Sequence, residues 1–393
     1  MTSPRDESPT ATNSNPSSTP RHRILVILGT RPEAIKLAPV IQALRSRPFC
    51  RALDTLVCVT AQHRTMLDQV LNAFEIQPEF DLDVMRPGQA LSDLSSRIIG
   101  ALAPVFDEVK PSLAIVQGDT TTTICASLTS FYSGVPLAHV EAGLRTRDMQ
   151  APFPEEANRV LTSRLASLHF PPTDWAASNL REEGIRDETI ITTGNTGIDA
   201  LFQTRAGLEA GKLASVAPQL RGGKKLIVVT AHRRENLGAA LDEICRAVLQ
   251  LSRRDDIEIL WPVHPNPRVR KTVRETVCGR ANVSLLEPLD YVSFVDLIQR
   301  AHLIITDSGG IQEEAPSLGK PVLVLRETTE RPEGVEAGTV KLVGTGTATI
   351  VREAIRLLDD EDEYGRMARI RNPYGDGRAS SRIAQRISTF LGV

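Results

Sequence analysis

Cysteine is scarce in this sequence and follows no disulfide or metal-binding pattern. The 393 residues contain five cysteines, and no two of them form a CxxC pair. An odd number without such spacing is untypical of a disulfide framework or a structural zinc site. We therefore expect reduced thiols in the core of a cytoplasmic protein. The five are Cys50, Cys58, Cys125, Cys245 and Cys278.

Long apolar runs are missing as well, and the charges nearly balance. No run approaches the ~20 residues that a membrane-spanning helix needs. A formal net charge of −2 argues against a protein that binds nucleic acid or a membrane surface in general. Residues 1–22 begin with a stretch rich in Ser, Thr, Pro and Asn that lacks the apolar segment of a signal peptide. We expect this segment to be a disordered tail.

Two common nucleotide-binding fingerprints are also absent. The sequence contains neither G-x-G-x-x-G nor a Walker A pattern, so neither NAD binding nor ATP-driven chemistry has support. The histidines lack the HExxH spacing of a zinc site, and His139-x-Glu141 lacks further ligands. We therefore expect no cofactor and no metal.

What is present is a regular alternation of apolar, strand-like runs and helical patterns. The length exceeds what one core usually organises, and continuous apolar strands are typical of parallel sheets covered on both faces. We expect an α/β protein of two doubly wound, Rossmann-like domains facing a cleft. The predicted strands are 24–28, 56–60, 113–117, 137–141, 168–171, 190–192, 225–230, 257–261, 283–286, 303–306 and 321–325, and the clearest helices are 65–74, 91–109 and 121–132.

The boundary between the two domains falls where strand character is lost, between residues 195 and 223. We assign residues 23–200 to an N-terminal domain and residues 201–377 to a C-terminal domain. In the last segment, residues 378–393, four apolar side chains fall on one face of a helix, so this helix must dock on an apolar surface. They are Ile383, Ile387, Phe390 and Leu391.

Two cations follow the first predicted strand. The apolar run to Leu28 leads through Gly29 into a helix, and this places Arg31 and Lys36 at the carboxyl end of that strand. Ligands of open α/β sheets bind at this end, and a helix N-terminus with two cations favours an anion such as phosphate. An ordinary turn with solvated charges is the alternative.

Carboxylates gather after the later strands of the same domain. Asp119 follows the strand 113–117, Glu141 ends the strand 137–141, and Glu155 opens a helix in which Arg159 comes one turn later. If the two strands are neighbours, Asp119 and Glu141 share a crevice with Arg31, which favours acid and base roles. Helix capping by Asp119 and a first-turn charge for Glu155 are the structural alternatives.

The C-terminal domain offers phosphate-binding features instead. Ser308, Gly309 and Gly310 form a small-residue turn whose N–H groups can converge on a phosphate, and Glu314 can accept hydrogen bonds from a ribose. A tight turn capped by serine is the alternative. His232, with the arginines that follow it, can hold a diphosphate, or it can belong to a solvated loop. His264 is a weaker candidate of the same kind.

Together these motifs resemble the non-hydrolysing UDP-N-acetylglucosamine 2-epimerases, over residues 23–391. The loop with Arg147 and Met149-Gln-Ala151 departs from the small or aromatic residues more usual there. The motifs that carry the resemblance are Gly29-Thr-Arg-Pro-Glu-Ala-Ile-Lys36, Gln117-Gly-Asp-Thr120, His139-Val-Glu-Ala-Gly-Leu-Arg145, Pro154-Glu-Glu-Ala-Asn-Arg159, His232-Arg-Arg-Glu-Asn236, Val263-His-Pro-Asn-Pro267, Asp307-Ser-Gly-Gly-Ile-Gln-Glu-Glu314, Thr329-Glu-Arg-Pro-Glu333 and Asn372-Pro-Tyr-Gly-Asp-Gly377.

The resemblance implies a fold like that of the two-domain GT-B glycosyltransferases, with the last helix packed on the first domain. It implies a cytoplasmic homodimer that interconverts UDP-GlcNAc and UDP-ManNAc without NAD and supplies ManNAc units for a cell-surface polysaccharide. UDP-GlcNAc is also an expected activator, bound near Gln62 and Arg64. The implied catalytic residues are Asp119, Glu141, Glu155 and His232, and the substrate-binding residues are Arg31, Lys36, Arg159, Ser308, Gly309 and Glu314, to which the residue patterns add His264 and Gly310.

The chemistry agrees with this set of residues, although other functions remain open. The C2–H of an N-acetylhexosamine is not next to a carbonyl, so C1–O cleavage must come first. That step needs cations for the departing UDP, and the steps at C2 need a base for C2–H and an acid on the opposite face of the sugar. The alternatives are a glycosyltransferase of the same fold, an enzyme for another UDP-sugar or one that hydrolyses the intermediate, and an inactive nucleotide-sugar sensor.

Overall fold

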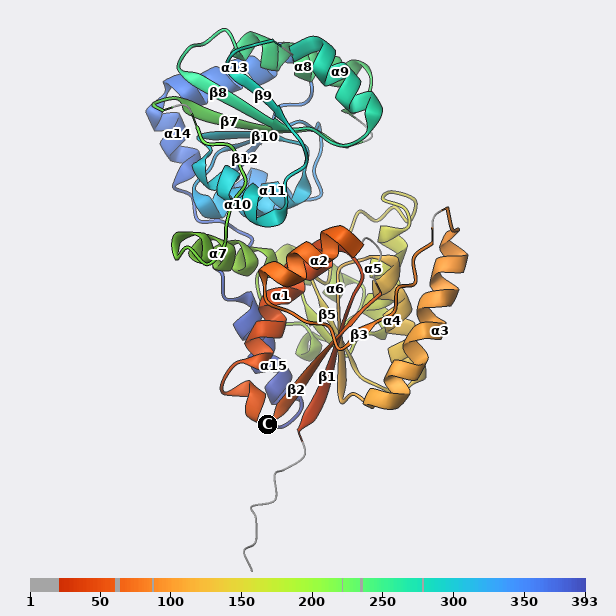
Figure 1. The fold of residues 1–393 in the computed structure, drawn as a ribbon. Helices are drawn as coiled ribbons and strands as arrows, with labels where there is room; N and C mark the ends of the chain where they lie inside the picture. Colours follow the sequence, from red (N-terminus) through yellow and green to blue (C-terminus); the bar gives the residue numbers. More distant parts are fainter. Residues whose placement is uncertain (1–20, 61–63, 87, 221, 234–235, 278) are drawn as a thin grey trace, which may run out of the picture.

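The computed structural model describes residues 21–60, 64–86, 88–220, 222–233, 236–277 and 279–393. The predicted tail lies outside them except for Arg21 and His22, and His22 begins the first strand. Gln62 and Cys278 also lie outside the described residues. The other four cysteines are free, and three of them are buried. The chain forms two α/β halves, each built on a parallel sheet, which confirms the predicted fold class (Figure 1).

The N-terminal half has a sheet of order β3-β2-β1-β4-β5-β6, in which neighbouring strands are parallel. Its strands are β1 His22–Leu28, β2 Leu53–Val59, β3 Phe80–Asp81, β4 Leu113–Gln117, β5 Leu137–Val140 and β6 Leu168–Phe170. Its helices are α1 Arg31–Arg45, α2 Arg64–Ala73, α3 Leu91–Val109, α4 Thr121–Tyr132, α5 Glu155–Leu165 and α6 Asp174–Glu182, with short 3₁₀ turns at Phe49–Arg51 and Asp187–Thr189.

The C-terminal half repeats this topology with the strand order β12-β11-β10-β7-β8-β9. Its strands are β7 Lys225–Thr230, β8 Ile257–Pro262, β9 Val283–Leu286, β10 Leu303–Thr306, β11 Val322–Val324 and β12 Val340–Leu342. Its helices are α8 Ala239–Leu251, α9 Pro267–Val277, α10 Tyr291–Arg300, α11 Gly309–Glu314, α12 Pro332–Ala337, α13 Thr347–Asp359 and α14 Glu361–Ala368, with a 3₁₀ turn at Ala315–Leu318.

Most of the predicted strands are present, and the differences lie at the edges of the sheets. The predicted strand at residues 190–192 is wrong, because Ile190 forms only an isolated bridge with His169. Gly194, with a φ of 93°, then turns the backbone away from the sheet. The sequence patterns also missed β3 and β12, which have two and three residues and are too short to show a period.

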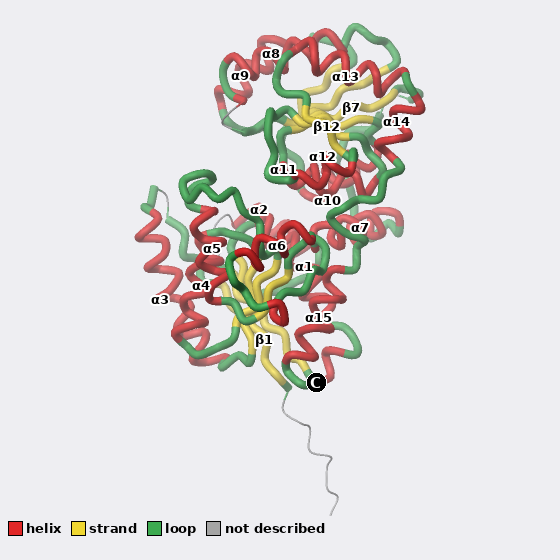
Figure 2. Tube along the Cα trace, turned by 180° about the vertical axis from the view of Figure 1, so that it is seen from behind, coloured by secondary structure: helices red, strands yellow, loops and turns green. Residues whose placement is uncertain are grey.

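The chain passes between the two halves twice. The first passage leads into α7 (Thr196–Glu209), and the second leads from α14 into α15 (Ala379–Phe390). The last helix packs against α1 and α7 beside the N-terminal half (Figure 2). Its side chains Ile383 and Ile387 are fully buried, whereas Phe390 keeps 38% of its surface exposed.

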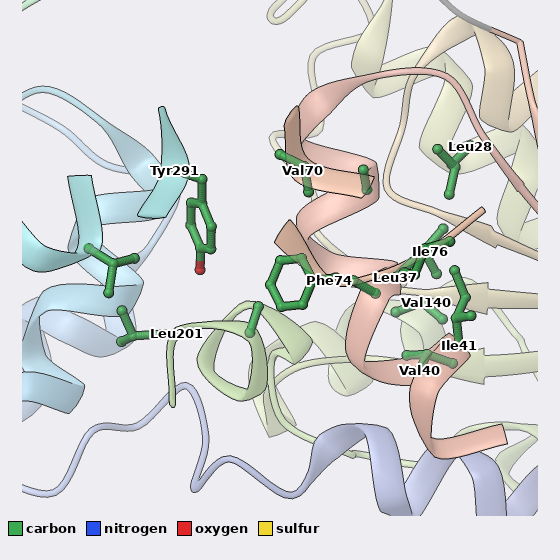
Figure 3. Packing of buried hydrophobic residues seen from close by; sticks show 14 of the residues in the cluster. Leu28, Leu37, Val40, Ile41, Val70, Phe74, Ile76, Val140, Leu201 and Tyr291 are labelled. Atoms are coloured by element: carbon green, nitrogen blue, oxygen red, sulfur yellow. The ribbon is translucent and has the colours of Figure 1, made fainter. Parts of the chain in front are cut away.

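One apolar cluster continues from the N-terminal sheet into the C-terminal half. Leu37 and Ile41 on α1 belong to it, and so do Phe74 and Tyr291. Figure 3 shows the ring of Phe74 facing Tyr291, and the two ring centroids are 6.2 Å apart. The contact joins the two halves beside α1, the helix that carries the predicted cations Arg31 and Lys36.

Candidate active site

The turn between β1 and α1 is fixed by a buried carboxylate. Glu33 is 1% exposed, and its Oε2 accepts hydrogen bonds from the backbone N–H groups of Gly29 at 3.0 Å and Thr30 at 2.7 Å. Its Oε1 accepts a hydrogen bond from the Thr120 hydroxyl at 2.8 Å. The start of α1 is thereby tied to the start of α4. This brings the predicted cations next to the carboxylates that follow β4 and β5.

Asp119 and Glu141 follow strands that are neighbours, which was the condition for the two acids to share a crevice. In the pairing of β4 with β5, Gln117 lies opposite Val140, so the two acids come off the same edge of the sheet. Glu141 has a φ of 62°, in the left-handed region that residues other than glycine seldom adopt. Such backbone strain persists where the surroundings enforce it, often at functional sites.

A cavity of about 280 Å³ opens at this edge of the sheet, and we call it the carboxylate cavity. It brings together Asp119, Glu141, Glu155, Lys36 and Arg159, all of which the sequence analysis had selected. Arg31 is not part of its lining. The remaining lining residues are Thr30, Pro32, Glu33, Gln117, Gly118, Thr120, Leu144, Pro152, Arg233, Glu330 and Arg331.

Glu141 and Lys36 form a buried ion pair at the wall of this cavity. Nζ of Lys36 donates to Oε1 of Glu141, and the Gln117 amide donates to Oε2. Burial raises the pKa of Glu141 above its usual range, although the nearby Lys36 ammonium opposes the change. For Lys36, burial disfavours the charged form, but Glu141 and Glu313 outweigh it and raise the pKa of the ammonium. A carboxyl with a raised pKa next to a firmly charged lysine can both take up and release a proton.

Asp119 has its own cation. Nη2 of Arg159 lies 2.8 Å from Oδ2 of Asp119, and Asp119 keeps 27% of its side-chain surface exposed toward the cavity. Arg159 is held from behind by Glu156, whose Oε2 lies 3.3 Å from Nη1. Glu155, the first residue of α5, lines the cavity and is only partly buried. Together with Glu33, which fixes the first turn of α1, the cavity wall therefore carries four acids and two cations from the N-terminal half.

A second cavity, of about 250 Å³, lies on the side of the C-terminal half, and we call it the histidine cavity. It contains His232, His264, Ser308 and Arg31. Arg31 and Lys36 are five residues apart on α1, which is about 140° around a helix, so they face different cavities. The other lining residues are Thr230, Ala231, Pro262, Val263, Pro265, Pro288, Leu289, Phe294 and Ile311.

His232 is oriented by an aspartate that is fully buried. Nδ1 of His232 lies 2.8 Å from Oδ1 of Asp307, whereas 39% of the histidine side chain is exposed. Oδ2 of Asp307 accepts hydrogen bonds from the backbone N–H groups of His232 and Arg233 and from the Asn236 amide, at 2.8, 2.9 and 2.9 Å. Burial opposes ionisation, but these donors hold the pKa of Asp307 below its usual range. A histidine held in this way presents Nε2 to a ligand.

His264 and Arg31 complete the polar part of this cavity. The rings of His232 and His264 stack, with centroids 6.2 Å apart and an angle of 19°. Burial, and then the neighbouring His232, lower the pKa of His264. Burial also lowers the pKa of Arg31, while Asp290 and Glu314 act in the opposite direction. The rest of the lining is mainly apolar, as expected for a site that holds a planar organic group.

The turn from Ser308 to Gly310 leads into α11; Ser308 lines the histidine cavity, whereas Gly309, Gly310 and Glu314 line neither of the two cavities. The N–H of Ser308 donates to the Thr306 hydroxyl at 3.0 Å, so Gly309 and Gly310 carry the N–H groups at the start of the helix. A Cβ on Gly309 would lie 2.5 Å from Cζ of Arg331, so a larger residue here would push the guanidinium of Arg331 from its place. Burial and the neighbouring Glu313 raise the pKa of Glu314 to about 8.

Sequence reasoning assigned no role to Glu313, Arg331 or Asp307. Glu313 and Arg331 form a buried pair with Oε1 and Nε 2.6 Å apart. All three lie in segments that had been quoted as motifs. Two features of the sequence indicated these acids: Glu313 directly precedes Glu314, and Asp307 directly follows a strand. Their partners could not be predicted, because they come from distant segments of the chain.

Features of two other classes of protein, metal sites and membrane-spanning helices, are absent from the described residues. Within them, no group of three or more His, Cys, Asp or Glu side chains is arranged to hold a metal ion. The helices of the described part of the chain include none that is both long and apolar enough to cross a membrane.

Sequence comparison finds one family for almost the whole chain. A profile of the family described as UDP-N-acetylglucosamine 2-epimerase matches residues 43–388. A UDP-N-acetylglucosamine 2-epimerase of Salmonella typhimurium is 51% identical over 374 residues, which make up 94% of this chain and 99% of the relative.

Solved structures agree with the sequence comparison. A UDP-GlcNAc 2-epimerase from Neisseria meningitidis, bound to UDP-GlcNAc, superposes with a TM-score of 0.86 at 46% identity, covering 94% of this chain and all of that one. The glycotransferase of kitacinnamycin superposes with a TM-score of 0.63 at 11% identity, covering 95% of this chain and 100% of that chain, and it shows the shared fold alone.

Proposed function

The chain belongs to the UDP-N-acetylglucosamine 2-epimerase family, and on that premise we propose that it interconverts UDP-GlcNAc and UDP-ManNAc reversibly. The reaction we propose is elimination of UDP to 2-acetamidoglucal, followed by re-addition of UDP with protonation from the opposite face. The observation that carries the proposal is the pair of adjoining cavities on either side of α1. One is lined by acids with cation partners, and the other by histidines and apolar side chains.

The histidine cavity is where we place the nucleotide and its diphosphate. His232, with Asp307 behind it, can carry a positive charge and stabilise the oxygen that leaves with UDP. Arg31 adds a second cation from the other half, and the apolar lining around Phe294 can receive the base. The start of α11 at Gly309 and Gly310 offers N–H groups to phosphate oxygens.

The carboxylate cavity is where we place the sugar. Once the C1–O bond breaks, the developing positive charge acidifies C2–H, and a carboxylate can remove that proton. Glu141 is our first candidate for this base, because its pKa is raised and Lys36 stabilises the anion that it forms on release of a proton. Asp119 and Glu155 are the candidates for the acid on the other face.

The stereochemistry at C2 tests the proposal. Purified protein is incubated with UDP-GlcNAc, and the sugar protons are followed by NMR. We expect UDP-ManNAc to accumulate to an equilibrium ratio that is the same when the reaction starts from UDP-ManNAc with a little UDP-GlcNAc added. Release of free ManNAc with UDP would instead indicate an enzyme that hydrolyses the intermediate.

Further expectations rest on the resemblance alone. We propose that UDP-GlcNAc also acts as an activator, that the protein is a homodimer in the cytoplasm, and that its product supplies a cell-surface polysaccharide. Gln62 lies outside the described residues, and Arg64 is the first residue of α2. A lag with pure UDP-ManNAc that UDP-GlcNAc abolishes is the expected sign of activation. Independence from NAD and from metal ions also stays a prediction.

A further inference from the structure

Glu313 is a buried acid of the cleft that the proposed proton transfers do not use. Only 4% of its side chain is exposed. Oε1 accepts a hydrogen bond from Nε of Arg331 at 2.6 Å, and Oε2 accepts one from the Asn195 amide at 2.8 Å. Oε2 also lies 4.0 Å from Nζ of Lys36, which belongs to the other half of the molecule. Both oxygens of this carboxylate are therefore engaged, and one contact crosses the cleft.

Both passages of the chain between the two halves contact Glu313. Asn195 caps α7 on the first passage. Asn372 lies on the second passage, and its amide donates to the backbone carbonyl of Glu313 at 2.7 Å. The two passages also bond to each other, through the N–H of Asn195 and the carbonyl of Tyr374 at 2.7 Å. Glu313 is thus held by both passages while its carboxylate faces Lys36.

Lys36 is shared between an acid of its own half and an acid of the other half. Its contact with Glu141 lies within the N-terminal half, so a rotation about the two passages leaves it unchanged. Its 4.0 Å distance to Glu313 crosses the cleft, so the same rotation changes it. When Glu313 is near, the lysine charge is divided between two carboxylates, and a second negative charge is placed close to Glu141.

The charged groups around Glu141 come from both halves. Lys36 on α1 is its direct partner, and Glu313 on α11 and Arg331 before α12 are the groups that the C-terminal half adds. Arg331 is itself held by Glu313. Asp119, Glu155, Arg159, Arg233 and Glu330 line the same cavity.

We propose that Glu313 is a positioning residue that ties the hinge to the Lys36–Glu141 pair, so that closure of the two halves sets whether Glu141 holds its proton. The inference rests on the proposed epimerisation, in which Glu141 exchanges a proton with C2. Substrate that bridges the two cavities closes the halves and brings Glu313 to Lys36, which strengthens the affinity of the Glu141 carboxylate for the proton that it takes from C2. Opening removes Glu313 and lets Lys36 stabilise the anion.

Three variants of the full-length protein test this role. Glu313→Gln keeps the shape and removes the charge, while Glu313→Asp keeps the charge and withdraws it by one methylene. The control is Glu353→Gln on α13, a carboxylate paired with Lys341 and Arg352, with 10% of its side chain exposed. For each variant we measure kcat and KM for UDP-GlcNAc across pH, UDP binding by calorimetry, and folding by circular dichroism.

We expect Glu313→Gln to lower kcat roughly 10- to 100-fold, as for a misplaced reacting group, and to change KM less than about threefold. One limb of the kcat–pH profile should report Glu141, and it is identified by its disappearance in Glu141→Gln. In Glu313→Gln this limb should move to lower pH, because a negative charge beside Glu141 is gone. Glu313→Asp should move it part of the way. Glu353→Gln should leave both kcat and the profile unchanged.

If the Glu141 limb of the kcat–pH profile stays at its wild-type pH in both Glu313 variants, the inference is overturned, even if kcat falls. A purely structural role for Glu313 predicts that result. Wild-type kcat in both variants would overturn it too. If Glu313→Gln does not fold, Glu313→Asp carries the same test. The proposed function is checked separately on the wild-type protein: failure to epimerise there is a failure of that proposal, whereas an active wild type with unaffected Glu313 variants refutes this inference alone.

Discussion

Both cavities lie at the ends of parallel strands, but the acids of the two cavities lie at different depths. In the carboxylate cavity, Asp119 and Glu141 lie at the wall, each next to a cation of its own half. In the histidine cavity, Asp307 is fully buried behind His232. An acid at the wall can exchange protons with a ligand, whereas an acid behind a histidine orients and charges that histidine. This difference supports our proposal that one half of the molecule transfers protons and that the other binds the departing diphosphate.

The largest effect that this comparison predicts follows loss of the acid at the wall. Glu141→Gln keeps the shape but removes the base, so we expect kcat to fall roughly 10²–10⁴-fold, the range typical of a general acid or base. The affinity for UDP, measured by calorimetry, should be unchanged because the proposed place of the diphosphate is the other cavity.

The matched control for Glu141→Gln is Glu183→Gln. Glu183 also pairs with a cation of the N-terminal half, Arg145, at 2.6 Å, but it lies outside both cavities. Its kcat should stay within about twofold of wild type. Equal losses of kcat in the two variants, or a matching loss of UDP affinity in Glu141→Gln, would break the assignment of separate tasks to the two cavities.

The next largest effect concerns the acid behind the histidine. Asp307→Asn removes the carboxylate that orients His232, and we expect kcat to fall about 10- to 100-fold. The free energy of unfolding should fall by roughly 2 kcal/mol, because hydrogen bonds to a buried charge are lost.

The stability effect of Asp307 also depends on pH. Because its pKa is depressed in the folded protein, its stabilisation is present above the unfolded pKa of about 3.9 and is lost as the pH falls through the folded value. Urea unfolding between pH 3 and pH 7 should therefore show a shallower loss in Asp307→Asn than in wild type. Parallel curves would contradict the role given to this acid.

These predictions depend on features that the sequence revealed only in part. The apolar run 113–117 ends at Gly118, so the end of β4 and the place of Asp119 followed from the pattern. The spacing of Arg31 and Lys36 on a helix implies that the two side chains face different cavities. We did not make this prediction from the sequence. The pairing of Lys36 with Glu313 was beyond reach, because it depends on how the two halves face each other.

A smaller effect is expected at Glu314. Its pKa of about 8 means that the folded protein holds a proton there at neutral pH. If ribose hydroxyls donate to this carboxylate, UDP affinity should rise between pH 6 and pH 8 more steeply than in Glu314→Gln. The stabilisation from this proton is present below the unfolded pKa of about 4.3 and is lost as the pH rises through 8. Identical calorimetric pH profiles would refute the ribose contact.

The smallest effect should follow removal of the second histidine. His264 stacks on His232, and His232 is the histidine that pairs with Asp307, so His264→Ala should weaken UDP binding only about three- to fivefold, near 1 kcal/mol. The kcat value should stay within about twofold of wild type. A kcat loss as large as that of Asp307→Asn would mean that His264, and not His232, faces the departing oxygen.

The most direct test of the account is the origin of the proton at C2. Wild-type protein and Glu141→Gln are incubated with UDP-GlcNAc in D₂O, and C2 is examined by NMR and mass spectrometry. We predict that the wild-type product carries one deuterium at C2, since the new proton comes from a side chain that exchanges with solvent, and that Glu141→Gln incorporates it at least roughly 10²-fold more slowly. UDP-ManNAc that forms at the wild-type rate without deuterium at C2 would contradict the account, because the carboxylates would then not transfer the proton.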